Sequence, residues 1–208
     1  MDYILQLRQY IGHRPILMVG AAILLVDGDN RLLMMKRSDN ECWGMPGGST
    51  EPGEVVEEAA KRETVEEVNL VVGEMSLFGV FSGPELYYKY PNGDEVYNVT
   101  IVYLSRDWRG EIKLNEEHTE WRWFAANEIP ENVSPPIKPV LEQFKRFASK
   151  IERDAPGDGS SDLCLFIVRA LKKTDQHRQP HERAPQESEK IIPNMELYQG
   201  VDGWAGNP

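Results

Sequence analysis

The sequence predicts one α/β domain followed by a polar tail, on three grounds. Short apolar stretches separated by turn residues alternate with two segments of helical periodicity. Apolar residues make up 40% of the 208 positions, which is enough to bury a core without disulfides. From Lys172 onward the chain is polar and has few aliphatic residues, a composition that cannot fold by itself. We therefore expect a domain over residues 1 to 152 and a partly disordered tail over residues 153 to 208, to which we assign no function.

The first part of the domain is predicted to contain a short helix and a hairpin. Residues 2 to 12 have the pattern of a helix that ends at Gly12. Residues 16 to 26 form an apolar strand, and residues 31 to 36 are expected to pair with it because an Asp-Gly turn signal lies between them. Residues 39 to 53 are rich in Gly and Pro and are expected to be a loop.

The main helix is expected next. Its good helix formers span residues 55 to 68, and its apolar positions available for burial are Val55, Ala59, Val65 and Val68. The strands expected after it cover residues 70 to 81, 85 to 90, 95 to 104 and 121 to 124, and a second, amphipathic helix covers residues 137 to 151. A brief apolar stretch at residues 163 to 171 is the part of the tail that could dock on the domain.

Charge and cysteine content narrow the classes of function. With 34 acidic and 23 basic residues the net charge is −11, which disfavours a long nucleic acid but leaves room for a small phosphate ligand if a metal ion is bound. The longest apolar run, residues 15 to 26, is shorter than the about 20 residues that a membrane helix needs. Because this run is short, we expect no membrane partner. Cys42 and Cys164 are too few for a disulfide framework or a zinc site, so we expect the protein to reside in the reducing cytoplasm.

Three carboxylates of the predicted main helix share one face. At about 100° per residue, Glu67 lies about 40° from Glu63 around the helix, and Glu66 lies about 60° to the other side. Like charges four residues apart destabilise a helix, and a hard cation bound between them would remove the repulsion. Mg²⁺ suits oxygen ligands and substrate phosphates, and Mn²⁺ could replace it. The alternative interpretation is an acidic helix end that faces water.

The glycine-rich loop ahead of this helix, residues 43 to 48, favours the metal interpretation. Glycine lets the backbone approach closely, so the loop could offer a carbonyl to a metal. Taken alone, the same loop would be read as a simple connection.

Together, these segments resemble the sequence box of the Nudix hydrolases. The family pattern is Gly, five residues, Glu, seven residues, and then Arg-Glu-aliphatic-any-Glu-Glu-any-Gly-aliphatic. The positions that match it are Gly48, Glu54, Arg62, Glu63, Glu66, Glu67 and Leu70. Thr64 and Asn69 depart from the pattern, but Asn also suits a left-handed helix end and neither change removes a carboxylate. The resemblance covers residues 14 to 150 and implies an α/β/α sandwich with a mixed central sheet.

The resemblance also implies a metal-dependent reaction in which water attacks a phosphorus of a diphosphate linkage. The Gly48 carbonyl, Glu63 and Glu67 would hold Mg²⁺, or Mn²⁺ in its place, and Glu66 would hold the metal or its bound water. Arg62 would pair with Glu54 and orient these ligands.

The general base is left open among three carboxylates. Glu66 lies inside the box, whereas Glu117 and Glu120 lie in an acidic loop where relatives often carry an additional acidic residue. His118 in the same loop is expected to be a surface residue rather than a catalytic one.

The expected substrate is a nucleoside diphosphate linked to another moiety. The alternatives are a nucleoside triphosphate of the kind removed in pool sanitation, and a ligand-sensing domain of this family that does not turn over its ligand. An unrelated α/β protein with a coincidental acidic helix is a third reading, which the gapped register of the box disfavours. Many family members pair, so a homodimer is among the expected partners.

Overall fold

The computed structural model describes residues 3–90 and 92–154, and the account below concerns these residues. The predicted tail from residue 155 onward, with the apolar stretch at 163 to 171 and Cys164, lies outside the described residues. Residues 153 and 154, which we had assigned to the tail, continue the last helix.

Two sheets form the centre of the domain. The first has the strand order β4-β1-β8-β6, with β7 also pairing with β8. Its strands are β1 (Ile16–Leu25), β4 (Gly47–Ser49), β6 (Ser76–Phe81), β7 (Tyr87–Lys89) and β8 (Glu95–Ser105). The second sheet joins β2 (Leu32–Arg37), β3 (Trp43–Gly44) and β10 (His118–Phe124), and a short pair joins β5 (Val71–Val72) and β9 (Trp108–Arg109). Because β1 and β8 run parallel while the other pairs of the first sheet are antiparallel, that sheet is mixed.

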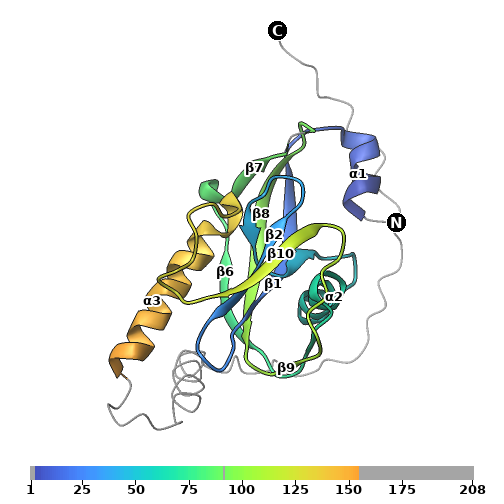
Figure 1. The fold of residues 1–208 in the computed structure, drawn as a ribbon. Coiled ribbons are helices and arrows are strands. Elements are labelled where there is room, and N and C mark those ends of the chain that lie inside the picture. The colour runs from blue at the N-terminus through green and yellow to red at the C-terminus, as the bar shows by residue number, and fades with distance from the viewer. Residues whose placement is uncertain (1–2, 91, 155–208) are drawn as a thin grey trace, which may run out of the picture. The chain divides into compact units, whose positions relative to one another are not determined.

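The helices lie on both sides of the strands. Figure 1 shows α2 (Val56–Val68) and α3 (Lys138–Asp154) flanking the sheets from opposite sides, with α1 (Tyr3–Ile11) near one end of β1. Two 3₁₀ turns, Pro84–Leu86 and Pro135–Ile137, precede β7 and α3. This arrangement confirms the predicted α/β/α sandwich with a mixed sheet.

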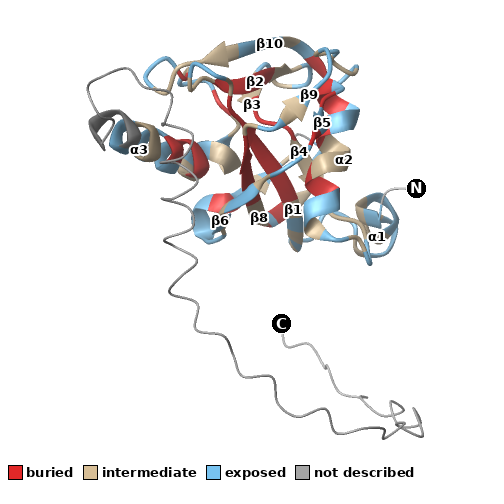
Figure 2. Ribbon diagram, turned by 90° about the horizontal axis from the view of Figure 1, so that it is seen from below, coloured by how far each residue is buried: buried red, intermediate tan, exposed pale blue. Residues whose placement is uncertain are grey.

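Strand alternation supplies two cores from the same strands. In β1, Ala22 and Leu24 belong to the core beneath α3, whereas Ala21 and Ile23 belong to the core beneath α2. Figure 2 shows the buried residues concentrated in these central strands. Burial of each leucine contributes about 1.5–3 kcal/mol to stability, so the buried Leu24 and Leu25 of β1 stabilise the two cores between which this strand lies.

The predicted hairpin between residues 16–26 and 31–36 is wrong in its pairing. The turn exists, since the Asp27 amide donates to the Arg31 carbonyl at 3.0 Å, and a single bridge joins Val26 to Leu32. Beyond that bridge the strands separate into different sheets, because β4 and β8 already occupy both edges of β1. The turn residue with positive φ is Asn30 (64°).

The buried face of α2 is rotated from the one we expected. Ala59 and Val68 are buried as predicted, but Val55 and Val65 are 59% and 44% exposed. Ala60, Thr64 and Glu67 are buried in addition. The helix therefore directs a carboxylate toward the strands, which apolar periodicity alone does not indicate.

The two departures from the family pattern are both accommodated. The Thr64 hydroxyl is fully buried and donates to the Ala60 carbonyl at 2.8 Å, so no polar atom is left unpaired. Asn69 ends α2 in the left-handed conformation, with φ 59° and ψ 29°, and its amide donates to the Val65 carbonyl. As predicted, the helix end survives without glycine.

Several strand limits also differ from the expected ones. The single strand expected at residues 70 to 81 is divided into β5 and β6, and the loop at 39 to 53 contains β3 and β4. The strand expected at 85 to 90 starts as a 3₁₀ turn, β10 starts at His118, and β9 was not predicted. Within the described ranges, no helix has the length and apolar character that crossing a membrane requires.

Candidate functional site

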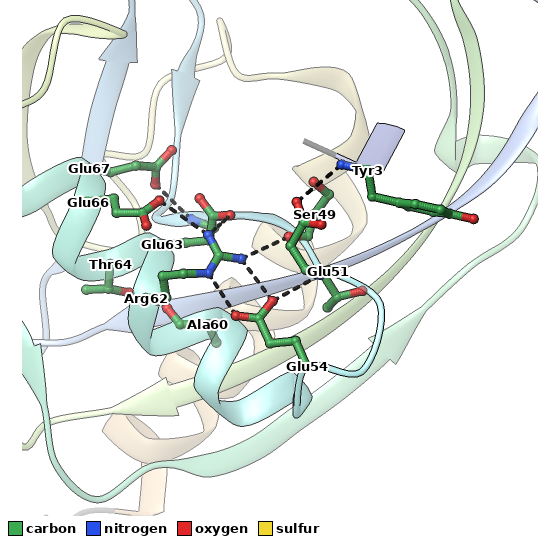
Figure 3. A network of polar contacts seen from close by, with 12 residues as sticks. Tyr3, Ser49, Glu51, Glu54, Ala60, Arg62, Glu63, Thr64, Glu66 and Glu67 are labelled. Atoms are coloured by element: carbon green, nitrogen blue, oxygen red, sulfur yellow. Dashed lines mark hydrogen bonds and ion pairs between the residues drawn. The ribbon is translucent and has the colours of Figure 1, made fainter. Parts of the chain in front are cut away.

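The guanidinium of Arg62 is the centre of a polar network at the open side of α2 (Figure 3). Its Nε and Nη2 donate to the two oxygens of Glu54, at 2.8 and 3.0 Å, which is a bidentate pair. Its Nη1 donates to Glu63 at 2.7 Å and to Glu66 at 3.3 Å, and its Nη2 reaches the Ser49 carbonyl at 3.2 Å. Arg62 thus ties the loop before α2 to the carboxylates on the helix.

The pairing with Arg62 changes the protonation of Glu54. The guanidinium, and then the Glu51 amide that donates to the same carboxylate, lower the pKa of Glu54 to about 2. Glu54 is therefore ionised at neutral pH and committed to Arg62. A carboxylate so engaged orients the arginine and is not a free base.

Glu63 lies directly against the glycine-rich strand β4. A Cβ added to Gly48 would stand 2.5 Å from the Glu63 carboxyl carbon, so a larger residue would displace this carboxylate. The Gly48 carbonyl oxygen, however, lies 3.0 Å from where a Gly20 Cβ would stand, and so faces β1. Burial raises the pKa of Glu63, and the hydrogen bond from Arg62 acts in the opposite direction.

Glu67 is the most buried carboxylate of the network, with 8% of its side chain exposed. The Gly47 amide donates to its Oε2 at 2.9 Å. Burial raises the pKa of Glu67 to about 8, and the nearby charges of Glu63 and Glu117 act in the same direction. A buried carboxylate with one backbone donor and two acidic neighbours lacks positive charge, which a bound cation would supply.

The remaining candidate carboxylates occupy different surroundings. The Glu66 side chain is 55% exposed at the rim, pairs with Arg62 at 3.3 Å and contributes to the raised pKa of Glu63. Glu117 precedes β10 and is close enough to raise the pKa of both Glu63 and Glu67. Glu120 pairs with Arg122 at 2.9 Å and is not among the leading causes of the pKa shift of either residue. The structure therefore groups Glu117, but not Glu120, with the helix carboxylates.

His118 is buried, in contrast to the surface position we expected. Only 7% of the residue is exposed, and the strand register shifts between His118 and Glu120. Its Nδ1 lies 3.0 Å from the Asn115 Oδ1, which also accepts the Glu117 amide, so Nδ1 carries the proton. Burial lowers the pKa of His118 to about 4, so its 3.9 Å approach to Glu67 is not an ion pair at neutral pH.

A cleft of about 440 Å³ opens beside these carboxylates. Glu67, His118, Gly47 and Gly48 line one end of it. The other walls come from α1, β1, β7, β8, the end of β2 and the 3₁₀ turn before α3. Arg37 lines the cleft as well, paired with Asp39 through two hydrogen bonds of 2.9 Å. Sequence reasoning missed Arg37, Asn98 and the contribution of α1, because they come from distant segments without a local motif.

The oxygen donors of the cluster suit a hard cation, but they do not enclose one. Glu63 and Glu67 supply carboxylate oxygens in a dry, negatively charged setting, which fits Mg²⁺ better than a soft metal. In the part of the chain that is described, no three His, Cys, Asp or Glu side chains converge closely enough to hold a metal ion by themselves. Mg²⁺ keeps several water ligands and binds substrate phosphates, so two carboxylates are compatible with it.

Comparison with known proteins gives one consistent family. A family model described as NUDIX domain matches residues 16–144. A protein of Bacillus subtilis named putative 8-oxo-dGTP diphosphatase is 36% identical over 155 residues, which cover 74% of this chain and 97% of that protein. A protein of Methanocaldococcus jannaschii named ADP-ribose pyrophosphatase is 36% identical over 109 residues, which cover 51% of this chain but only 61% of that protein.

A solved structure agrees with these matches. The MutT NUDIX hydrolase from Burkholderia pseudomallei is 31% identical, with a TM-score of 0.53, and the match covers 62% of this chain and 98% of that one. The residues that the family model matches run from the start of β1 into α3 and include the carboxylates of α2.

Proposed function

The chain belongs to the NUDIX family, and we propose that it cleaves the diphosphate linkage of a nucleoside diphosphate that carries another moiety. It is a pyrophosphohydrolase, and its substrate is a small nucleotide. The observation that carries the proposal is the group of Glu63, Glu67 and Glu117, which act on one another electrostatically and of which Glu67 lines a cleft of about 440 Å³.

In this proposal Glu63 and Glu67 hold the metal, which we take to be Mg²⁺ with Mn²⁺ as a substitute. When bound, the metal polarises the attacking water and screens the charge of the diphosphate. Glu66 at the rim binds the metal through water. The Gly47 amide holds Glu67, whereas the Gly48 carbonyl, which we expected to bind the metal, faces β1. The role that we propose for Gly48 is therefore to leave room for the Glu63 carboxylate.

Arg62 and Glu54 act as positioning residues. Their bidentate pair fixes the guanidinium, which in turn fixes Glu63 by the 2.7 Å hydrogen bond. Because Arg62 also reaches the Ser49 carbonyl, it holds β4 at a set distance from α2. Geometry of this kind determines how well the carboxylates hold a cation and its water.

Among the candidate bases, Glu117 is the one that we favour. It acts electrostatically on both Glu63 and Glu67, and its own side chain is exposed to solvent. Glu66 remains the second candidate, and the pairing of Glu120 with Arg122 makes Glu120 the least favoured of the three.

A substrate panel tests the proposed function. ADP-ribose, nucleotide sugars, dinucleoside polyphosphates and ordinary and oxidised nucleoside triphosphates are incubated with Mg²⁺, with Mn²⁺ and with a chelator. We expect metal-dependent release of a nucleoside monophosphate from a diphosphate-linked compound. The relative of Bacillus subtilis makes triphosphate hydrolysis the second candidate, which release of pyrophosphate would identify. Tight binding of a compound without turnover would instead indicate a sensing role and refute the proposal.

A further inference from the structure

We propose that the apolar residues 163 to 171 of the tail dock on an apolar face of the mixed sheet that the rest of the domain leaves uncovered. This surface, which we call the apolar sheet face, lies on the opposite side of the sheet from the cleft. It takes no part in the proposed reaction, so the inference does not depend on the proposed function. Its residues are Leu17 and Val19 of β1, Tyr97, Val99 and Ile101 of β8, Leu77 and Val80 of β6, and Tyr87 of β7.

Strand pairing places these side chains on one side of the sheet. Leu17 is paired with Tyr97 in β8, and Val80 is paired with Ile101 of the same strand. Paired residues project to the same side, as do residues two apart along one strand. In β1 the next residue on this side, Ala21, already lies in the core beneath α2. The apolar sheet face is therefore the part of the same surface that α2 does not cover.

The side chains of this face are exposed although they are apolar. Leu17 is 75% exposed, Val80 60% and Leu77 53%, and Figure 2 shows exposed residues along β6. Tyr87 and Tyr97 are exposed as well and pack against each other, with ring centroids 5.2 Å apart. A continuous apolar surface that extends over four strands is typical of an interaction site.

The tail contains a segment of matching chemistry. Arg169 is the only charged residue between positions 163 and 171, and the others are apolar. The residues on either side of this segment, Asp162 and Lys172, are charged. Contact with water is unfavourable for both the segment and the apolar sheet face, so their association is driven by the hydrophobic effect.

The end of α3 brings this segment close to the face. Phe147 of α3 packs against Phe78 of β6, with ring centroids 5.9 Å apart. The helix continues to Asp154, which is about 10 Å farther at 1.5 Å per residue. In the described part of the chain β6 is an edge strand of its sheet. A chain that passes around this edge from α3 reaches the other side without crossing another strand.

The chain between the helix and the segment is long enough for this path. Packed layers are spaced about 10 Å apart, so the way from α3 past the edge of the sheet to a layer on its other side is about 20 Å. With a return of about 10 Å along the helix the path is about 30 Å at most. Ten residues, 155 to 164, lead from Asp154 to Cys164 and can extend over about 33 Å.

Tethering favours the tail over a second copy of the chain as the occupant of the face. A segment joined by a short linker meets its site at an effective concentration of about a millimolar. Two copies must instead approach each other with a net charge of −11 each, and like charges repel.

Disulfide trapping with Cys164 tests the docking in the full chain. Cys42→Ser removes the other native thiol, and Val80→Cys or Leu77→Cys adds one to the part of the face that the tail reaches first. Asp29→Cys is the matched control, since the Asp29 side chain is 77% exposed and shares a small cavity with Ala148 of α3. It is near the path of the tail but outside the face.

Under mild oxidation, at least one of the two face variants should form a disulfide within one chain about tenfold faster than Asp29→Cys, because docking holds the two thiols close. Phe166→Asp with Ile167→Asp should reduce that rate to the rate of the control. The same change farther along the tail, Ile191→Asp with Ile192→Asp, should leave it unaltered. Circular dichroism verifies that each variant is folded, and the two face positions replace each other if one variant is not.

Three results would overturn the proposal. The first is trapping at the face that is no faster than trapping at Asp29→Cys. The second is fast trapping that persists after Phe166→Asp and Ile167→Asp. The third is a disulfide that joins two chains through Val80→Cys or Leu77→Cys, which would identify a second copy as the occupant of the apolar sheet face.

Discussion

Replacement of Glu67 by glutamine should affect stability and activity in opposite directions. At pH 7, keeping a proton on a carboxyl with an ordinary pKa of 4.5 costs about 3 kcal/mol. Burial raises the pKa of Glu67 to about 8, so the folded, metal-free chain keeps this proton at pH 7 whereas the unfolded chain loses it. The free energy of unfolding is lowered by an amount of this order. Glutamine has nearly the same volume and can still accept from the Gly47 amide. Glu67→Gln should therefore raise the metal-free free energy of unfolding by about 2–3 kcal/mol at pH 7.

The size of this stabilisation depends on pH in a defined way. Because the folded chain holds the Glu67 proton above the ordinary pKa of 4.5, the wild type loses stability as pH rises from about 4.5 to 8. The glutamine variant lacks this loss, so its advantage should grow over the same interval. Urea unfolding in the presence of a chelator at several pH values measures it.

Activity should change in the other direction. Loss of one ligand charge should lower kcat at least about a hundredfold with Mg²⁺. Glu58→Gln is the control on the same helix, since the Glu58 side chain is 66% exposed and pairs with Lys61 at 3.5 Å. Lower metal-free stability of Glu67→Gln, or full turnover by it, would refute the assignment of Glu67 as a buried metal ligand.

Three further predictions follow from the same contacts. Arg62→Lys cannot form the bidentate pair with Glu54, so kcat should fall about tenfold or more while KM changes little, and unchanged kcat would contradict its positioning role. Gly48→Ala places a methyl group 2.5 Å from the Glu63 carboxyl carbon, so calorimetry should show weaker Mn²⁺ binding, and wild-type affinity would contradict this. Glu117→Gln should lower kcat about tenfold or more while Glu120→Gln stays within about twofold, and steady-state rates with the reverse order would reassign the base.

The sequence predicted those features that depend on neighbouring residues. Arg62, Glu63, Glu66 and Glu67 lie on one helix, so helical geometry suffices to bring them together, and Glu54 lies in the loop just before it (Figure 3). The C-terminal cap at Asn69 is likewise a local property.

Features that depend on packing between distant segments could not be predicted in this way. The rotation of α2 is set by the strands beneath it, so Val55 and Val65 are exposed although their spacing allows burial. Glu117 and Glu120 belong to one acidic stretch, and only the strand register and the partner Arg122 separate their surroundings. Asn98 has no local signal, because its burial arises from the pairing of β8 with β1.

Hydrolysis in heavy-oxygen water is the most direct test of the central claim, that the carboxylates beside the cleft direct water onto a phosphorus. A diphosphate-linked nucleotide that the chain cleaves is incubated with Mg²⁺ in water labelled with heavy oxygen, and the masses of the products are measured by mass spectrometry. The account predicts one heavy oxygen in one phosphate-containing product, at a rate that Glu67→Gln nearly abolishes. Label in the departing moiety instead of a phosphate, or cleavage that persists with a chelator, would contradict it.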